Sequence, residues 1–266
     1  MKIYTSFWTC AIRNDREAIK DQDMIVFYMK KFTEYTKNIY GEVHLITDSS
    51  GYEYLKDVGF TSIDLYLDNI SKEYNHVWNY GKLNCVNYIA KKNEHFLHLD
   101  YDFFILKKMS DYVESGEVVF QSREDANYYF YGKDYFIKNC KNKYLTQEFD
   151  YENENIAYNC GIMGGKNCTF FKEYTESSLK MINDLENKNF WFKNWREIPE
   201  YKEFTKCILA EQYYAYLYCK QMNIIPTLFW DTDNYDPKIK KFLENGAFHL
   251  YGRYKINFYK KNKASA

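Results

Sequence analysis

The stretch Leu97-His98-Leu99-Asp100-Tyr101-Asp102-Phe103-Phe104 places two carboxylates inside an otherwise apolar run. In a regular strand, side chains two residues apart point to the same face, so Asp100 and Asp102 are expected to converge on one point. Like charges that close repel each other, and uncompensated charge in apolar surroundings is costly. A hard divalent ion such as Mg²⁺ or Mn²⁺ binds carboxylate and phosphate oxygens together. We therefore predict a metal site here, against the alternative that an Asp-x-Asp merely ends a strand and caps a turn.

Around this stretch, segments with strand character alternate with segments of helical periodicity. Strands are expected at 2–10, 42–48, 61–67, 94–106, 117–121, 155–165 and 224–229, and the main helices at 19–40, 77–92, 169–188 and about 205–222. Such alternation predicts a parallel sheet covered by helices, with the two aspartates near the carboxyl end of one strand. Loops are expected at 123–155 and 186–204, where they would border one side of a substrate-binding cleft. A turn near 233–237 and an end without regular structure complete one domain over 1–258, followed by a tail at 259–266.

Composition excludes several classes of protein. The net charge of -1, from 36 basic and 37 acidic residues, does not favour a nucleic acid or an anionic membrane as partner. No stretch approaches the length of a membrane span. The seven cysteines are odd in number and contain no Cys-x-x-Cys pair, which indicates buried thiols in a reducing compartment. Because the apolar run from Ile3 to Ile12 is typical of a first strand rather than a signal peptide, we expect a cytoplasmic protein.

Four motifs occur in the order found in a known family. Lys82-Leu83, then a helix, then Phe96 to Asp102, resembles the Asp-x-Asp region of GT-A-fold glycosyltransferases, in particular the glycogenin and galactinol synthase type. The other three motifs are Asn159-Cys160-Gly161-Ile162-Met163, Glu211-Gln212 and His249-Leu250-Tyr251-Gly252-Arg253-Tyr254-Lys255. They resemble the family's Asn-x-Gly strand beside the donor sugar, its acidic residue followed by Gln, and its His-x-x-Gly-x-x-Lys. The resemblance runs over roughly 1–258 and implies an α/β fold of the GT-A (Rossmann-like) type, with a mixed, mostly parallel central sheet flanked by helices.

The C-terminal motif offers groups that fit a metal and a diphosphate. Neutral imidazole suits Mn²⁺, so His249 can complete a site begun by Asp100 and Asp102, unless it is a partly buried structural histidine. Gly252 would let backbone approach a diphosphate closely, and Lys255 would supply a point charge to it. The remaining histidines are expected to be structural, and they are His44, His76, His95 and His98.

The two middle motifs offer groups for a sugar. Asn159 could set its amide against sugar hydroxyls, with Gly161 allowing close approach, or the motif could be a turn at a strand end. Gly164-Gly165 is expected to be a turn. Glu211 and Gln212 are consecutive and cannot share a helix face, so one could point into a cleft while the other braces it. Their alternative is two solvated helix residues.

Further donor contacts are expected at the carboxyl ends of the first strands, where sheets of this kind bind ligands. Thr5 and Phe7 are candidates for contacts with the base or the ribose of a nucleotide donor. Tyr101 is a further candidate for a contact with this donor. Lys82 either braces the diphosphate or is a solvated helix charge.

The resemblance implies a hexosyltransferase-type enzyme that uses Mn²⁺ or Mg²⁺ and retains the anomeric configuration. It would transfer a sugar from a nucleoside-diphosphate sugar, first of all a UDP-sugar, to a hydroxyl of a carbohydrate, glycolipid or protein. Gln212, Glu211 and Asn159 would be its catalytic residues. The sequence departs from the family where Glu211 replaces the usual Asp and where no Pro-Trp follows Lys255, which leaves the donor sugar open.

Two alternatives belong to other classes. The first is an inactive GT-A-like protein that binds a sugar or nucleotide, although the intact Asp100, Asp102 and His249 argue against a decayed site. The second is a nucleotidyltransferase, which also uses paired aspartates on a sheet. It would need a glycine-rich, basic loop after the first strand, and Thr9-Cys10-Ala11-Ile12-Arg13 is not such a loop.

Overall fold

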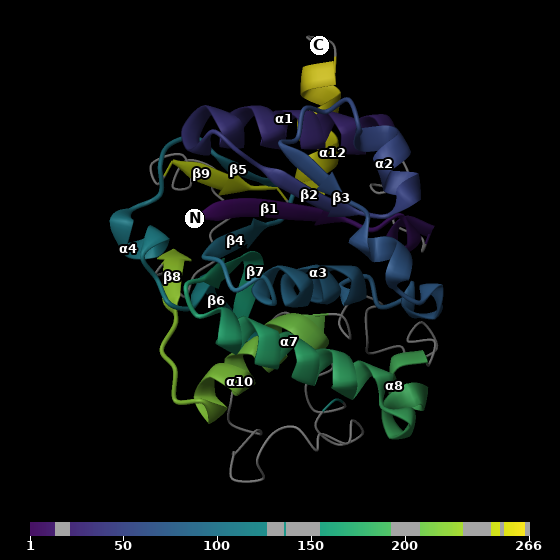
Figure 1. The fold of residues 1–266 in the computed structure, drawn as a ribbon, viewed down its shortest axis with the longest axis vertical. Helices are drawn as coiled ribbons and strands as arrows, with labels where there is room; N and C mark the ends of the chain where they lie inside the picture. Colours follow the sequence, from purple (N-terminus) through teal and green to yellow (C-terminus); the bar gives the residue numbers. More distant parts are fainter. Residues whose placement is uncertain are drawn as a thin grey trace.

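The structure is a computed structural model that describes residues 1–13, 22–126, 136, 155–192, 208–230, 246–250 and 253–263. Within these residues, a central sheet lies between two layers of helices (Figure 1). Its seven described strands follow the order β3-β2-β1-β4-β7-β6-β8, and β5 and β9 form a separate small sheet.

The first half of the chain builds the parallel side of the sheet. Its strands are β1 (Lys2–Phe7), β2 (His44–Thr47), β3 (Ser62–Asp64) and β4 (Phe96–Leu99). The connecting helices are α1 (Gln22–Tyr40), α2 (Ser49–Leu55) and α3 (Tyr80–Ala90), with 3-10 turns at Thr9–Arg13, Tyr66–Asn69 and Lys72–Tyr74. All three strand pairs, β1 with β2, β1 with β4 and β2 with β3, are parallel. The strand–helix alternation predicted from the sequence is confirmed here.

The second half adds one reversed strand and two more parallel ones. The elements are β6 (Val119–Asp125), β7 (Ile156–Gly165) and β8 (Thr227–Trp230). β7 runs antiparallel to both β4 and β6, while β8 pairs parallel to β6. The sheet is therefore mixed and mostly parallel, and helices flank it, as the sequence predicts.

Each face of the sheet has its own apolar core. On one face lie α3, α7 (Cys168–Asn183) and α10 (Tyr214–Gln221) (Figure 1). Leu83, Phe171 and Leu217 are buried in this core. On the other face lie α1 and α12 (Arg253–Lys263), which pack with the small sheet of β5 (Phe103–Ile105) and β9 (Ala247–His249). There the rings of Tyr28 and Phe104 lie 6.0 Å apart.

The remaining described elements are short. They are α4 (Asp111–Glu114), a 3-10 turn at Leu185–Asn187, α8 (Lys188–Phe192) and a π-helical stretch, η7 (Leu209–Tyr213), which continues into α10. The described cysteines are free and buried, as expected, namely Cys10, Cys85, Cys160, Cys168 and Cys219. None of the helices in the described part combines the length and apolarity needed to cross a membrane.

The strand predicted at 94–106 is wrong in one respect, because it is two strands joined by a turn. β4 ends at Leu99, and the backbone N–H of Phe103 donates to the carbonyl of Asp100 at 2.8 Å. β5 then leaves the central sheet to pair with β9. Asp100 and Asp102 therefore do not share the face of one regular strand, contrary to the sequence prediction, and lie in the turn between two strands instead.

Two further expectations differ from the structure. Gly164 and Gly165 do not form a turn but complete β7, since Gly164 pairs with Leu97 on β4 and Val119 on β6. A Cβ on Gly164 would overlap the carbonyl oxygen of Phe96, so only glycine fits. The end expected without regular structure contains α12.

Part of the sequence prediction lies outside the described residues. This applies to the turn near 233–237, to most of the loop at 123–155 and to 193–204 of the second loop. β6 itself continues to Asp125, beyond the strand end predicted at 121.

Candidate metal centre

The carboxyl ends of the parallel strands form one edge of the sheet, and the candidate site lies there. The turn Asp100–Asp102 begins where β4 ends. β7 runs past this turn in the opposite direction, and Gly161 accepts a hydrogen bond from the backbone N–H of Asp100 at 2.9 Å. Residues of β6 reach the same edge because β6 is antiparallel to β7 and hence parallel to β4.

Three metal-ligating side chains meet at this edge. Asp100, Asp102 and His249 each offer one ligand atom, and these atoms all lie within 4.8 Å of one another. Nε2 of His249 is 3.2 Å from Oδ1 of Asp102, and their side chains are only 9% and 5% exposed. Two carboxylates and one imidazole form a donor set that suits Mn²⁺, and Mg²⁺ prefers the oxygens among them. The residues present thus fit a divalent ion.

The small sheet explains how His249 reaches two residues so distant in the sequence. Phe103, directly after Asp102, pairs with His249 across β5 and β9. The backbone N–H of Leu250 donates to the carbonyl of Asp102 at 2.9 Å. The backbone therefore fixes both sides of the candidate site before any ion is considered.

Lys82 is not a solvated helix charge. Its Nζ lies 2.7 Å from Oδ1 of Asp100 and 2.9 Å from Oε1 of Glu211, and it donates to the carbonyl of Cys160 at 2.6 Å. Burial would lower the pKa of Lys82, but Asp100 and then Glu211 outweigh this and raise it above its ordinary value. Lys82 therefore carries a fixed positive charge next to the candidate metal ligands.

Glu211 is not a solvated residue either, since it is 1% exposed. Asn79 Nδ2 donates to its Oε2 at 3.5 Å. Burial raises the pKa of Glu211, while Lys82 lowers it. The opposite charge of Lys82 is what allows this carboxylate to lie inside the protein.

Glu211 lies in the wide turn of η7, which places its side chain next to Lys82. Side chains of α7 hold the turn, because Tyr174 donates its hydroxyl to the Glu211 carbonyl at 2.8 Å and Ser178 donates to the Ala210 carbonyl at 2.6 Å. Such π-helical turns are frequent at functional sites. Gln212 follows Glu211 in η7 and is half-buried.

Asn159 is committed to contacts within the protein. Its Oδ1 accepts from the backbone N–H of Gly161 at 2.8 Å, and its Nδ2 donates to Oε1 of Glu124 at 2.5 Å. Glu124 is 8% exposed, and burial raises the pKa of its carboxyl group. Glu124 was not predicted from the sequence, because it lies in the polar stretch expected to be a loop and found to be the end of β6. The signal available was a run of polar residues directly after a predicted strand.

Gly161 makes room for side chains rather than only for a ligand. A Cβ at this position would overlap Oε1 of Gln121 and lie 2.7 Å from Cε1 and 2.8 Å from Nδ1 of His249. The glycine thus lets the His249 ring and the Gln121 amide approach β7. Gln121 is a second residue of the site that the sequence analysis did not identify.

Some of the residues predicted to contact the donor lie at the same edge of the sheet as the candidate metal centre. The rings of Phe7 and Tyr101 are 6.4 Å apart in an edge-to-face arrangement, with Phe7 buried and Tyr101 half-buried. Thr5 lies inside β1 and is fully buried. Gly252 lies outside the described residues, as does the side chain of Lys255, although the backbone of Lys255 belongs to α12.

His98 has a structural role, as expected. It lies in β4 and is 1% exposed, and its Nε2 is 2.8 Å from the hydroxyl oxygen of Ser6. Burial, and after it the charge of Lys82, lowers the pKa of His98 to about 3. The ring is therefore neutral at physiological pH.

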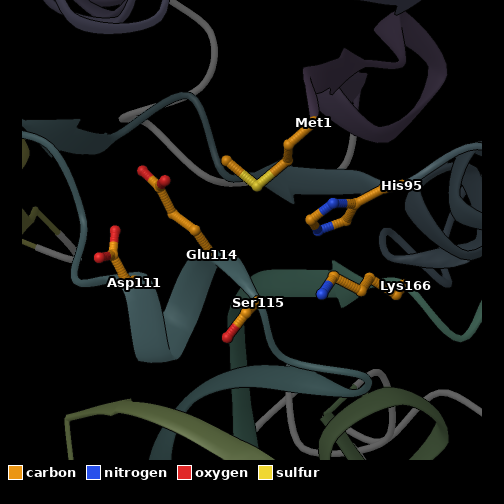
Figure 2. Close-up of a pocket in the computed structure, with 6 residues that line it drawn as sticks. All are labelled: Met1, His95, Asp111, Glu114, Ser115 and Lys166. Atoms are coloured by element: carbon orange, nitrogen blue, oxygen red, sulfur yellow. The ribbon is translucent and has the colours of Figure 1, made fainter.

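The structure also has a hollow at the other edge of the sheet (Figure 2), lined by Met1, His95, Asp111, Glu114, Ser115 and Lys166. Met1 precedes β1 and His95 precedes β4, so this hollow lies where the parallel strands begin. Its acidic residues are already within ion-pairing distance of a lysine, since Lys108 lies 3.1 Å from Glu114 and 3.7 Å from Asp111. It shares no residue with the candidate metal centre.

Comparison with known proteins includes a family model that spans almost the whole chain. The sequence model of a family described as "Family of unknown function (DUF6734)" matches residues 1–265. No curated protein matches the sequence.

Several solved structures are similar at low identity. An active-site mutant of LgtC has a TM-score of 0.43 and 10% identity, over 95% of this chain and 88% of that chain. The galactosyltransferase LgtC in complex with donor and acceptor sugar analogs has a TM-score of 0.39 and 11% identity, over 92% and 95%. Mouse xyloside xylosyltransferase 1 in its apo form has a TM-score of 0.37 and 9% identity, over 80% and 82%. With TM-scores this low, function has to be argued from the residues of the site.

Proposed function

This chain belongs to the family DUF6734, and we propose that it is a divalent-metal-dependent glycosyltransferase. It would transfer a sugar from a nucleoside-diphosphate sugar, first of all a UDP-sugar, to a hydroxyl of a carbohydrate, glycolipid or protein. The observation that carries the proposal is the meeting of Asp100, Asp102 and His249 at the carboxyl edge of a mostly parallel sheet. Ligands of such sheets bind at this edge.

Asp102 and His249 would hold the ion, with Asp100 beside them. A bound Mn²⁺ or Mg²⁺ supplies positive charge that stabilises a departing diphosphate. Asp102 is 3% exposed and lies 3.2 Å from Nε2 of His249, so an ion held by both residues would be shielded from solvent on the protein side.

Lys82 would act on the site by holding Asp100. Its ammonium group contacts Asp100 and is itself held by Glu211 and the Cys160 carbonyl. Because these partners lie on three different elements, the lysine fixes the position of the Asp100 carboxylate relative to β7 and η7.

The side chains expected to take part in catalysis divide into two groups. Glu211 and Asn159 are bonded within the protein and would position their neighbours, namely Lys82 and Glu124. Gln212 is half-buried, and its amide would lie near the anomeric carbon of the donor. Attack on the donor from the side of the leaving group would then retain the anomeric configuration.

The remaining candidates would bind the donor. Phe7, Tyr101 and Thr5 would form the nucleoside side of the site, and Gly252 and Lys255 would contact the diphosphate.

The proposal is tested by incubating the protein with UDP-glucose, UDP-galactose, UDP-xylose and UDP-N-acetylglucosamine and measuring the UDP released. We expect release from at least one donor with Mn²⁺ and none with EDTA. Asp102→Asn should lower the rate by about 100-fold or more, the loss expected from removing charge stabilisation of several kcal/mol. Lack of release from every donor, while a known transferase works in the same assay, would refute the proposal.

Retention is tested separately on the product. The anomeric proton of the transferred sugar is followed by NMR from the start of the reaction, with an α-linked donor. An α-linked product supports retention, and a β-linked product refutes it while leaving the transferase assignment in place. Calorimetric titration with UDP tests the alternative of an inactive binding protein, which predicts binding that is independent of Mn²⁺.

A further inference from the structure

Gln121 lies at a break in the register between β6 and β7. Phe120 pairs with Met163 and Ser122 pairs with Asn159, so the segment 160–162 of β7 stands opposite Gln121 alone. Such bulges redirect side chains and are frequent beside active sites. Here the bulged segment presents the carbonyls of Cys160 and Gly161 to Lys82 Nζ and to the backbone N–H of Asp100.

The amide of Gln121 is buried without a partner. The residue is 0% exposed, and neither its Oε1 nor its Nε2 has a hydrogen-bond partner in the described part of the chain. Buried polar groups are nearly always hydrogen-bonded, and an exception calls for an explanation such as a missing ion or a changed geometry in the functional state. Gln121 is therefore expected to gain a partner when the site is occupied.

The neighbour that this amide faces is His249. Oε1 of Gln121 and the Cε1–Nδ1 edge of the His249 ring border the same position, the one that a Cβ on Gly161 would fill. No side chain separates the two groups because residue 161 is glycine. The two groups therefore face each other across the space beside Gly161.

The two nitrogens of His249 have different surroundings. Nε2 faces Asp102 at 3.2 Å and is the nitrogen available to a metal. Nδ1 then has to carry the proton, and a histidine that ligates a metal almost always donates this second N–H to an acceptor, which fixes the tautomer and the ring orientation.

We infer that Gln121 is a positioning residue whose Oε1 accepts a hydrogen bond from Nδ1–H of His249 and so aims Nε2 at the metal. The inference rests on the metal site of the proposed function and adds to it a residue outside the ligand set. Gly161 belongs to the same arrangement, because any larger residue would occupy the space in which the Gln121 and His249 side chains meet.

The test is calorimetric titration of the full chain with Mn²⁺ alone. Gln121→Met keeps the length of the side chain and removes the acceptor, and it should weaken Mn²⁺ binding about 10- to 100-fold, as loss of such a partner usually does. Gln121→Glu retains an acceptor and should bind Mn²⁺ within about threefold of the wild type or more tightly. Ser122→Ala is the matched control, since its buried hydroxyl lies next in β6, and it should leave the affinity unchanged.

Two readouts separate positioning from a merely structural role. The metal-free Gln121→Met protein should be at least as stable to urea as the wild type, because a buried unpaired amide is replaced by an apolar group. In ¹⁵N NMR with Mg²⁺, His249 should be the Nδ1–H tautomer in the wild type and a mixture of tautomers in Gln121→Met.

Wild-type Mn²⁺ affinity in Gln121→Met would overturn the inference. A metal-free stability that falls together with the affinity would overturn it too, as would a wild type that binds no Mn²⁺. If the wild type binds Mn²⁺ with Gln121 positioning His249 but releases UDP from no donor, only the proposed function is refuted and the inference about Gln121 stands.

Discussion

At the scale of single residues, the least expected arrangement is the ion-pair group of Lys82, Asp100 and Glu211, in which the lysine and glutamate side chains are only 10% and 1% exposed. In the sequence each residue has an ordinary surface alternative. In the structure, one lysine on α3 compensates a carboxylate on the turn after β4 and another on η7. Because removing one partner leaves the other charge buried and uncompensated, such groups are sensitive to single substitutions.

Substitution of Lys82 gives the first prediction. Lys82→Met should lower the free energy of unfolding in urea by about 3 kcal/mol, because Glu211 is left without a counter-charge. The double variant Lys82→Met/Glu211→Gln should recover most of that loss. Lys31→Met is the control, since Lys31 forms an exposed pair with Glu34 at 3.0 Å and should change stability by less than about 0.5 kcal/mol. Equal losses at Lys31 and Lys82 would contradict this account.

His98 gives a prediction on pH dependence. The folded protein keeps this ring neutral down to about pH 3, whereas the unfolded chain takes up a proton near the ordinary histidine pKa of 6.5. The unfolded state therefore binds more protons between these values, and stability falls as the pH falls below 6.5. From pH 7.5 to 5, metal-free wild type should lose about 2 kcal/mol more than His98→Gln in urea unfolding. If the stability of the two proteins falls by the same amount between pH 7.5 and 5, His98 is not the group that causes the loss.

At the scale of elements, the close approach of β7 to β4 depends on glycine. Gly164 has a φ of +155°, and a Cβ there would meet the Phe96 carbonyl oxygen. Gly164→Ala should lower the free energy of unfolding by about 3 kcal/mol, since the overlap is with backbone that cannot move aside. Gly41→Ala is the comparison, because Gly41 has a φ of +77° but nothing within 4 Å, and its cost should be about 1 kcal/mol. A smaller loss at Gly164 than at Gly41 would contradict this reading of the sheet.

Sequence periodicity predicted most of the central sheet because most of its strands lie in short apolar runs between turn signals. It could not separate β4 from β5, since Phe103–Ile105 continues the apolar run of Phe96–Leu99 and only hydrogen bonding reveals that the second piece pairs with β9. β9 itself has three residues, too few for a periodic signal. β6 was predicted too short because its last residues, from Gln121 to Asp125, are polar.

At the scale of the whole molecule, the candidate metal centre joins the two sheets. Asp100 and Asp102 extend from the central sheet, and His249 comes from the small one. The sequence predicted that the two aspartates converge, and the order of the motifs with the chemistry of imidazole predicted that His249 joins them. It could not predict Gln121 or Glu124, because their closeness to His249 and Asn159 depends on the β6–β7 register.

An ion at this junction should stabilise the folded protein as a whole. Mn²⁺ at 100 times its Kd should raise the free energy of unfolding by about 2.7 kcal/mol, measured by urea unfolding with and without the ion. Asp102→Asn should abolish this gain. Asp111→Asn should keep it, because the Asp111 side chain is 99% exposed and lies at the opposite edge of the sheet (Figure 2). A gain that survives Asp102→Asn would place the stabilising ion elsewhere.

The central claim is that Asp102 and His249 bind one divalent ion that also binds a nucleoside diphosphate. The most direct measurement is a crystal grown with UDP and Mn²⁺, with anomalous scattering recorded at the manganese absorption edge. We expect one peak between the Asp102 carboxylate and Nε2 of His249, in contact with diphosphate oxygens. UDP bound without a peak at these residues, or a peak at another place on the protein, would contradict it.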